Sequence, residues 1–419
     1  MNDTVNQWVD ENQETLVDFL RKIIQIPSVT GNEAEIQEYL CKYTSAMGME
    51  SVSFVPSLEE LGTHPAFVKS DMPYENRPDV VAISHGAGGG RSLLFNGHVD
   101  VIPEGPAENW KHPCWGGEIE DGKLYGRGAS DMKSGVAAMT MAMKVLKECG
   151  IRLKGDVTIE YVMDEELTGN GTLACVMKGY KADAGICCET SSMCVQPASI
   201  GRIWFDIHVK GKAAGIQRRY EGVNAIDLGY LVKEAVEAFE KDRVARTSHP
   251  LYPNIIEAIP CMIGQFSSGS YASAFPDECL LKGSMATVPG ESSDGVKAEF
   301  IDFICKYTAE RNEWLASNPP QVIYTGYFAE PSEIPSDSPI VTMLSDNFGK
   351  VMGKPPVISG RQGAADIRHL NTYGDTPTVI FGPGRTEEMH ANNEWVDLND
   401  YVNAVKILAN TIIDWCGIA

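Results

Sequence analysis

The chain has 419 residues, of which 43% are hydrophobic and 22% charged, and its net charge at pH 7 is −22. This composition is typical of a globular protein, and the length favours two domains rather than one core. The negative charge argues against nucleic acid or an anionic membrane as a partner, because both need a basic surface. The apolar runs are too short to cross a bilayer, and the acidic stretch 1–11 does not resemble an export signal.

The cysteines favour a cytoplasmic protein. There are 11 of them and no Cys-x-x-Cys pair, so neither a zinc ribbon nor a disulfide framework is predicted. The odd number, with Cys187 and Cys188 adjacent, is typical of reduced thiols. We therefore expect free cysteines and a cytoplasmic location.

Hydrophobic spacing predicts helices at 16–26, ended by Pro27, and at 33–47. A helix of small residues is predicted at 134–149, and a final helix at 399–416. Buried strands are predicted at 80–84, 92–95, 157–163, 183–188 and 378–381. Several of these elements adjoin an acidic or imidazole side chain at the end where α/β sheets place their sites.

The middle of the chain changes its pattern. Strand, helix, two strands, helix and strand are predicted in turn, at 203–209, 225–246, 261–265, 278–285, 295–317 and 321–327. This order is the split βαβ arrangement. The expected fold is therefore α/β, with a discontinuous catalytic domain at 1–199 and 329–419 and an inserted ferredoxin-like α+β domain at 200–328. The catalytic domain should contain a mostly parallel central sheet flanked by helices.

Five potential metal ligands lie in short motifs along the chain: His98, Asp131, Glu166, Glu189 and His390. Two imidazoles and three carboxylates suit Zn²⁺, and they suit a pair of ions if one carboxylate bridges. Glu165 adjoins a ligand, where it could take a proton from a metal-bound water. This pattern predicts hydrolysis at a site with two Zn²⁺ ions per chain, with Co²⁺ or Mn²⁺ as alternatives.

These motifs, together with Gly126–Lys133, resemble those of the M20 metallopeptidase family. Within it, the chain looks closest to the acetylornithine deacetylase and succinyl-diaminopimelate desuccinylase group. The resemblance extends from residue 17 to the C-terminus. It implies that the inserted domain is a lid or dimerisation domain, and that the protein is a homodimer.

The resemblance also implies a role for each residue of the site. Asp131 would bridge two zinc ions, one held by His98 and Glu189 and the other by Glu166 and His390.

The acid–base chemistry would fall to a neighbouring carboxylate. Glu165 would be the general base, which deprotonates the bridging water and passes the proton to the leaving amine. Asp100 would orient His98 by accepting its second ring N–H.

The resemblance suggests how a substrate is held. Arg368 falls where relatives have an arginine that binds a substrate carboxylate, which predicts a small carboxylate-bearing substrate. The alternative is that Arg368 pairs with Asp366. Asn393, near His390, would add a polar contact to the substrate or form a turn.

The chain departs from the family pattern in the inserted domain. Gly215 occupies the place of a histidine that stabilises the oxyanion in relatives, and the arginine that often precedes the Pro289–Glu291 turn is missing. Arg218, Arg219 or His208 could replace the histidine. Otherwise the substrate does not need that donor.

The leading functional hypothesis is a deacylase that cleaves the amide bond of a small N-acyl amino acid or related N-acyl amine. Alternatives are a dipeptidase or carboxypeptidase, and a hydrolase of another C–N bond, such as an amine on a small carboxylated ring. A non-catalytic metal-binding dimer is less consistent with Glu165, because a structural site has no use for a free base. The sequence assigns no role to the insertion-like stretch 56–76, which could shape the site entrance.

Overall fold

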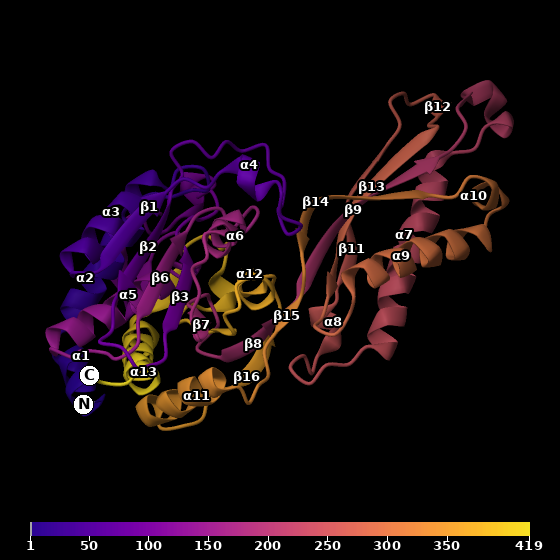
Figure 1. The fold of residues 1–419 in the computed structure, drawn as a ribbon. Helices are drawn as coiled ribbons and strands as arrows, with labels where there is room; N and C mark the ends of the chain where they lie inside the picture. Colours follow the sequence, from indigo (N-terminus) through magenta and orange to yellow (C-terminus); the bar gives the residue numbers. More distant parts are fainter. Residues whose placement is uncertain (1) are drawn as a thin grey trace. The chain divides into compact units, whose positions relative to one another are not determined.

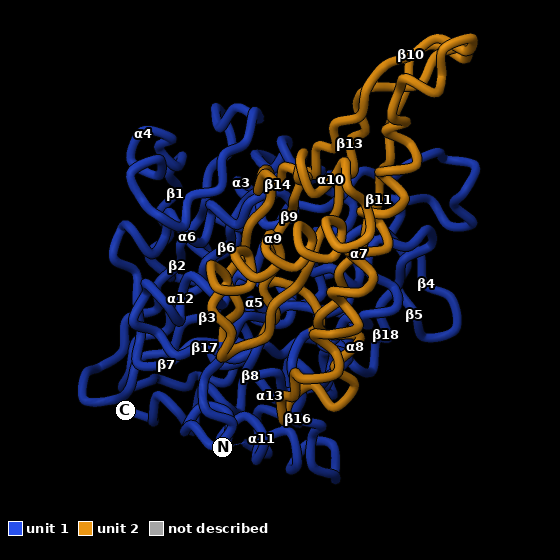
Figure 2. The backbone as a smooth tube through the Cα atoms, turned by 90° about the vertical axis from the view of Figure 1, so that its right-hand side faces the viewer, with its two compact units in different colours: residues 1–198, 333–361, 365–419 blue, residues 199–332, 362–364 orange. Residues whose placement is uncertain are grey.

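The computed structural model describes residues 2–419 and divides into two compact units. Unit 1 comprises residues 1–198, 333–361 and 365–419, and unit 2 comprises residues 199–332 and 362–364 (Figure 2). The expected boundaries, at 199/200 and 328/329, lie within a few residues of these. The short return of 362–364 to unit 2 was not anticipated.

Unit 1 is built on a nine-stranded sheet whose centre is parallel. The four central strands, in spatial order, are β6 (Val157–Val162), β3 (Leu93–His98), β7 (Ala184–Cys187) and β17 (Thr378–Ile380). The other five strands are β1 (Glu50–Phe54), β2 (Asp79–Ser84), β8 (Val195–Ser199), β15 (Ser332–Glu333) and β16 (Ile358–Arg361).

The sheet is mixed rather than mostly parallel. Strand β2 pairs antiparallel with both β1 and β6, and β8 pairs antiparallel with β17. The central strands are buried along their whole length, whereas most residues of β1 are exposed. Antiparallel strands tolerate one solvated face, which explains why they lie outside the parallel centre.

Helices cover this sheet (Figure 1). The most enclosed is α5 (Lys133–Glu148), in which 13 of 16 residues are buried against β3, α2 and α13. Helix α1 (Asn2–Glu11) buries Val5 and Val9. The other helices of unit 1 are α2 (Gln13–Ile24), α3 (Ala34–Ala46), α4 (Leu58–Leu61), α6 (Asn170–Met177), α11 (Pro339–Met352), α12 (Ile367–Thr372) and α13 (Leu398–Cys416).

Unit 2 has its own sheet and its own core. Its main elements are β9 (Gly201–Lys210), α7 (Ala225–Arg246), β11 (Cys261–Ser268), β13 (Glu278–Thr287), α9 (Ser293–Ala309), α10 (Glu313–Ser317) and β14 (Gln321–Ala329). The strand order is β11-β13-β9-β14, and neighbouring strands are antiparallel. Alternate residues of β9 are buried in a core shared with α7 and α9, as a sheet covered on one face requires.

Small elements complete the two units. In unit 1, β4 (Glu118–Glu120), β5 (Lys123–Tyr125) and β18 (Trp395–Asp397) form a three-stranded sheet. In unit 2, β10 (Ala214–Gly215) pairs with β12 (Ala274–Phe275). Short helical turns are α8 (Ile255–Ala258), η1 (Ala107–Asn109), η2 (Ile216–Glu221) and η3 (Thr386–Glu388). Among residues 2–419, no helix is long and apolar enough to cross a membrane.

Candidate metal centre

The five predicted ligands all lie in unit 1, where parallel strands end. His98 is the last residue of β3, Glu166 follows β6, and Glu189 follows β7. These strands run in the same direction, so their carboxyl ends meet at one edge of the sheet. Asp131 lies just before α5, and His390 lies between η3 and β18. The pairing of β18 with β5 brings the His390 loop to the segment that leads to Asp131.

Asp131 stands between the two imidazoles. Its Oδ1 lies 3.2 Å from His98 Nε2, and its Oδ2 lies 3.5 Å from His390 Nε2. Glu189 Oε2 is 3.2 Å from the same nitrogen of His98, and Glu166 Oε2 is 3.1 Å from that of His390. The donors therefore form two groups that share one carboxylate. In His98, Asp131 and Glu166, one ligand atom of each lies within 4.8 Å of the others.

The charges of this cluster fit a pair of divalent cations. Four carboxylates, those of Asp131, Glu165, Glu166 and Glu189, lie close together with little exposure. Glu189 Oε2 is buried and faces the same imidazole nitrogen of His98 as Asp131 does. Uncompensated buried carboxylates are costly, and cations would compensate them.

Protons bound to the two imidazoles would also compensate part of this negative charge. Burial by itself lowers the pKa of His98. Hydrogen bonds to Asp131 and Glu189 nevertheless raise this pKa well above its usual range. Hydrogen bonds to Asp131 and Glu166 raise the pKa of His390 to about 10. Metal ions and protons therefore compete for the same nitrogens.

Glu165 lies at the edge of this donor set. Its Oε2 is 4.0 Å from His98 Nε2, farther than the carboxylates of Asp131 and Glu189, and its side chain is 16% exposed. Burial raises the pKa of Glu165 well above its usual range. A carboxylate held back from the imidazoles with an elevated proton affinity can accept and release a proton.

Asp100 differs from its expected role. His98 Nδ1 lies 2.9 Å from the main-chain carbonyl oxygen of Asp100 and 3.6 Å from its carboxylate. The Asp100 carboxylate instead accepts the backbone N–H groups of Glu165 and Glu166, at 3.1 and 3.3 Å. It thus holds the loop that bears Glu165 and Glu166, while the main chain contacts the imidazole.

Sequence reasoning missed two buried residues that organise the site. Arg361 Nη2 donates to Glu189 Oε1 at 2.6 Å. Glu394 Oε1 accepts the backbone N–H groups of Ser130 and Asp131, at 2.8 and 2.9 Å. Glu394 ends the His390 motif, so its position was a signal of a role. Nothing local distinguished Arg361, because its partner lies 172 residues away.

The predicted substrate-binding residues lie in other settings. Arg368 is 3% exposed, and its Nη1 lies 3.4 Å from Asp366 Oδ1, which is the pairing named above as the alternative to substrate binding. Its Nη2 donates to the Thr168 carbonyl at 2.9 Å. Asn393 donates to the Asn109 carbonyl at 3.2 Å and accepts the backbone N–H groups of Lys111 and His112.

The remaining residues raised by the departure from the family pattern belong to unit 2. Arg218 is exposed and pairs with Glu221. Gly215 has open space where a side chain would point.

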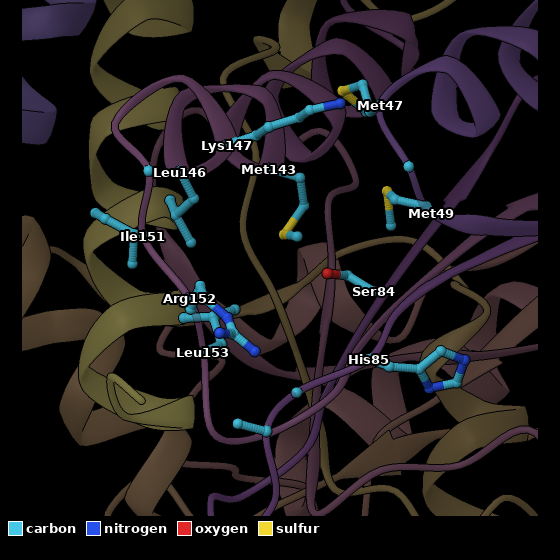
Figure 3. Close-up of a pocket in the computed structure, with 14 residues that line it drawn as sticks. Met47, Met49, Ser84, His85, Met143, Leu146, Lys147, Ile151, Arg152 and Leu153 are labelled. Atoms are coloured by element: carbon cyan, nitrogen blue, oxygen red, sulfur yellow. The ribbon is translucent and has the colours of Figure 1, made fainter.

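A separate cavity of about 320 Å³ also lies in unit 1 (Figure 3). Met143, Leu146 and Ile151 line one side of it, and Met49 and Ser84 line the other. It adjoins the end of β2 and the C-terminus of α5 and contains none of the predicted site residues.

The chain belongs to peptidase family M20/M25/M40, whose family model matches residues 94–414. The family and this donor set together define a class: the protein is a metal-dependent hydrolase of amide bonds.

Two curated relatives are similar to the chain over nearly its whole length. The chain is 29% identical to the N-formyl-4-amino-5-aminomethyl-2-methylpyrimidine deformylase of Bacillus subtilis, over 99% of this chain and 97% of the relative. It is 28% identical to the deformylase of the same description from Halalkalibacterium halodurans, over 97% of this chain and 96% of the relative.

Solved structures share the fold at lower identity. Human carnosine dipeptidase 1 superposes with a TM-score of 0.75 at 14% identity, covering 99% of this chain and 98% of the other. A tripeptidase of Staphylococcus aureus superposes with a TM-score of 0.73 at 21% identity, covering 96% of this chain and 98% of the other. A dinuclear metal-binding peptidase of the M20 family from Bacillus subtilis superposes with a TM-score of 0.67 at 15% identity, covering 96% of this chain and 98% of the other.

Proposed function

We propose that the protein removes a formyl or other small acyl group from a small N-acyl amine, and that the first candidate substrate is a formylated aminomethylpyrimidine. The main support is the pair of donor groups around Asp131, whose two carboxylate oxygens face the imidazoles of His98 and His390. Glu165 lies at the edge of these groups, farther from His98. The descriptions of the two curated relatives, which align over nearly the whole chain, support this substrate.

Each residue has a proposed task. Asp131 would contribute to two cation positions, of which His98 and Glu189 would complete the first and Glu166 and His390 the second. Two divalent cations there, Zn²⁺ by the softness of this donor set, would polarise the acyl carbonyl and make a water more acidic.

The proton transfers belong to Glu165. It accepts a proton from the attacking water, whose oxygen forms a bond to the acyl carbon. It then donates this proton to the leaving nitrogen as the C–N bond breaks, which yields a carboxylic acid and an amine. Asp100 keeps Glu165 in place through the backbone.

The surroundings of Arg361 and Arg368 support a substrate without a carboxylate clamp in unit 1. Both guanidinium groups are buried, and each binds protein groups: Arg361 binds Glu189, and Arg368 binds Asp366 and a main-chain carbonyl. An aminopyrimidine needs no such clamp. The expected carboxylate-bearing substrate therefore becomes the second candidate.

The state of the protein in the cell is part of the proposal. All 11 cysteines are free thiols, which supports a reducing compartment, the cytoplasm. We also propose a homodimer, which rests on the family resemblance alone and which sedimentation would test.

The test combines metal analysis with a substrate panel, using wild type, Glu165→Gln and Glu387→Gln. The panel holds a formylated aminomethylpyrimidine, N-acetyl amino acids and dipeptides. We expect two metal ions per chain in all three proteins and turnover of the formamide by wild type. Glu165→Gln should lose about 10²–10⁴-fold in kcat, because it removes the general base.

Glu387→Gln changes an exposed glutamate close to His390 and should match wild type. Full activity in Glu165→Gln would contradict the assigned base. Turnover of dipeptides in preference to the formamide would overturn the proposed substrate and leave the site intact.

A further inference from the structure

The loop 164–170 carries both the proposed base and one proposed ligand, and its shape depends on Asp164. The Asp164 backbone has a φ of +69°, an unusual value for a residue other than glycine. Its carbonyl oxygen accepts the backbone N–H groups of Thr168 and Gly169, at 2.9 and 2.8 Å. The direction in which Glu165 and Glu166 leave the loop therefore follows from how Asp164 is held.

Two residues between β1 and β2 hold the Asp164 carboxylate. Arg77 Nη2 donates to Asp164 Oδ1 at 2.6 Å, and the Tyr74 hydroxyl donates to Oδ2 at 2.9 Å. Arg77 also binds Glu33 through two hydrogen bonds of 2.9 and 2.7 Å. The side chains of Arg77, Glu33 and Asp164 are at most 1% exposed. Because a buried charge without its partner is costly, this triad tolerates little displacement.

The same segment holds the far end of the loop. Asn170 Nδ2 donates to the Val68 carbonyl at 2.8 Å and to the Tyr74 hydroxyl oxygen at 2.7 Å. The Val68 N–H donates to Asn170 Oδ1 at 3.2 Å. The hydroxyl of Tyr74 therefore contacts both ends of a loop that Asp100 holds in the middle.

We propose that Tyr74 and Arg77 are positioning residues, which set the places of Glu165 and Glu166 through Asp164 and Asn170. This inference rests on the proposed function. It gives a task in the reaction to the segment 68–77. All but the last residue of this segment belong to the stretch 56–76, to which the sequence assigned no role. Among the described residues, their side-chain hydrogen bonds go to Glu33, Asp164 and Asn170 and not to a proposed ligand, so both Tyr74 and Arg77 act through the loop.

The arrangement predicts an asymmetric effect on the two cation positions. Glu166 belongs to the second position and comes from the held loop. The first position takes His98 from β3 and Glu189 from beyond β7. Among the described residues, the side-chain hydrogen bonds of Tyr74 and Arg77 go to Asp164, Asn170 and Glu33 instead. Loosening the segment should therefore weaken the second position and displace the base, while the first position stays.

The experiment titrates metal-free protein with Co²⁺, followed by visible absorption and calorimetry. The variants are Tyr74→Phe, which removes only a hydroxyl, and Arg77→Lys, which keeps a charge but loses the fork that spans two carboxylates. We expect one of two Co²⁺ affinities to fall about 10–100-fold in each variant, with the other unchanged. On any substrate that turns over, kcat should fall while KM stays near that of wild type.

Matched controls separate positioning from stability. Tyr401→Phe removes a buried hydroxyl that donates to the Leu16 carbonyl at 2.9 Å, and Arg243→Lys alters a buried arginine paired with Glu291 in unit 2. Both controls should lower the unfolding temperature but keep two Co²⁺ affinities.

Two unaltered Co²⁺ affinities in Tyr74→Phe and Arg77→Lys, with only a lower unfolding temperature, would overturn the inference. This outcome differs from a failure of the proposed function, because the titration needs no substrate. A wild type that binds two Co²⁺ ions but cleaves no amide would refute the function alone. A wild type with fewer than two sites would refute both.

Discussion

At the scale of single residues, three consecutive carboxylates have three different environments. Asp164 is fully buried and bound by Arg77, Glu165 is held back from the imidazoles, and Glu166 lies beside His390. The chemistry of the three side chains is nearly the same. Burial and partners alone separate a structural anchor, a proposed base and a proposed ligand.

One glycine tests how closely the ligand-bearing segments approach. Gly135 lies in the first turn of α5, four residues after Asp131, and a Cβ there would lie 1.7 Å from the carbonyl oxygen of Cys188. Gly135→Ala must therefore displace α5 from the segment that leads to Glu189. We expect the free energy of unfolding, measured in urea, to fall by about 1–3 kcal/mol.

Gly349→Ala is the matched control for this change. Gly349 lies in α11, and a Cβ there would meet only one atom, at 4.0 Å. Alanine should stabilise that helix by about 0.5–1 kcal/mol. Equal effects of the two substitutions would show that α5 does not pack as described.

At the scale of elements, the central strand β6 has a carboxyl group within the sheet. Glu160 is fully buried and accepts a hydrogen bond from Asn96 Nδ2 at 3.0 Å. Burial raises the pKa of Glu160 to about 8, so this side chain is mostly protonated in the folded protein at pH 7. A strand can contain such a group because it folds in the neutral form.

The shift has a definite sign. The folded pKa is above that of an unfolded glutamate, so the proton stabilises the fold. This contribution is complete below about pH 4 and is lost as pH rises through about 8. We therefore expect Glu160→Gln, which stays neutral, to be more stable relative to wild type at pH 9 than at pH 6. Urea unfolding of both proteins at the two pH values measures this, and a pH-independent difference would contradict it.

At the scale of the whole molecule, the two largest hydrophobic cores of the described residues belong to different units. One core belongs to unit 1 and contains α5, β3 and α13; the other belongs to unit 2 and contains β9, α7 and α9. All five proposed ligands belong to unit 1. Metal binding should therefore stabilise one unit only.

Removal of metal by a chelator tests this division. In calorimetry we expect two unfolding transitions, of which only one falls when metal is removed. The fall arises because ligand binding at 100 times its dissociation constant stabilises by about 2.7 kcal/mol. Phe239→Leu, in the core of unit 2, should lower the other transition. Equal shifts of both transitions on chelation would show that the units unfold together.

The secondary structure near the site followed largely from local sequence. The predicted strands 92–95, 157–163 and 183–188 correspond to β3, β6 and β7, because buried strands are short apolar runs that end at polar residues. The predicted helix 134–149 corresponds to α5 within one residue at each end. Edge strands such as β1 escaped prediction, because exposed strands lack a continuous apolar run.

The fold class followed from hydrophobic spacing alone. The family and the residues that could hold metal followed from short sequence motifs. Only the tertiary structure decided that Asp100 holds a loop, that Arg368 pairs with Asp366, and that Glu394 binds the backbone of Asp131. Glu394 and Asp131 are 263 residues apart. Such pairs have no period or spacing in the sequence, because their distance is set by the packing of strands and helices between them.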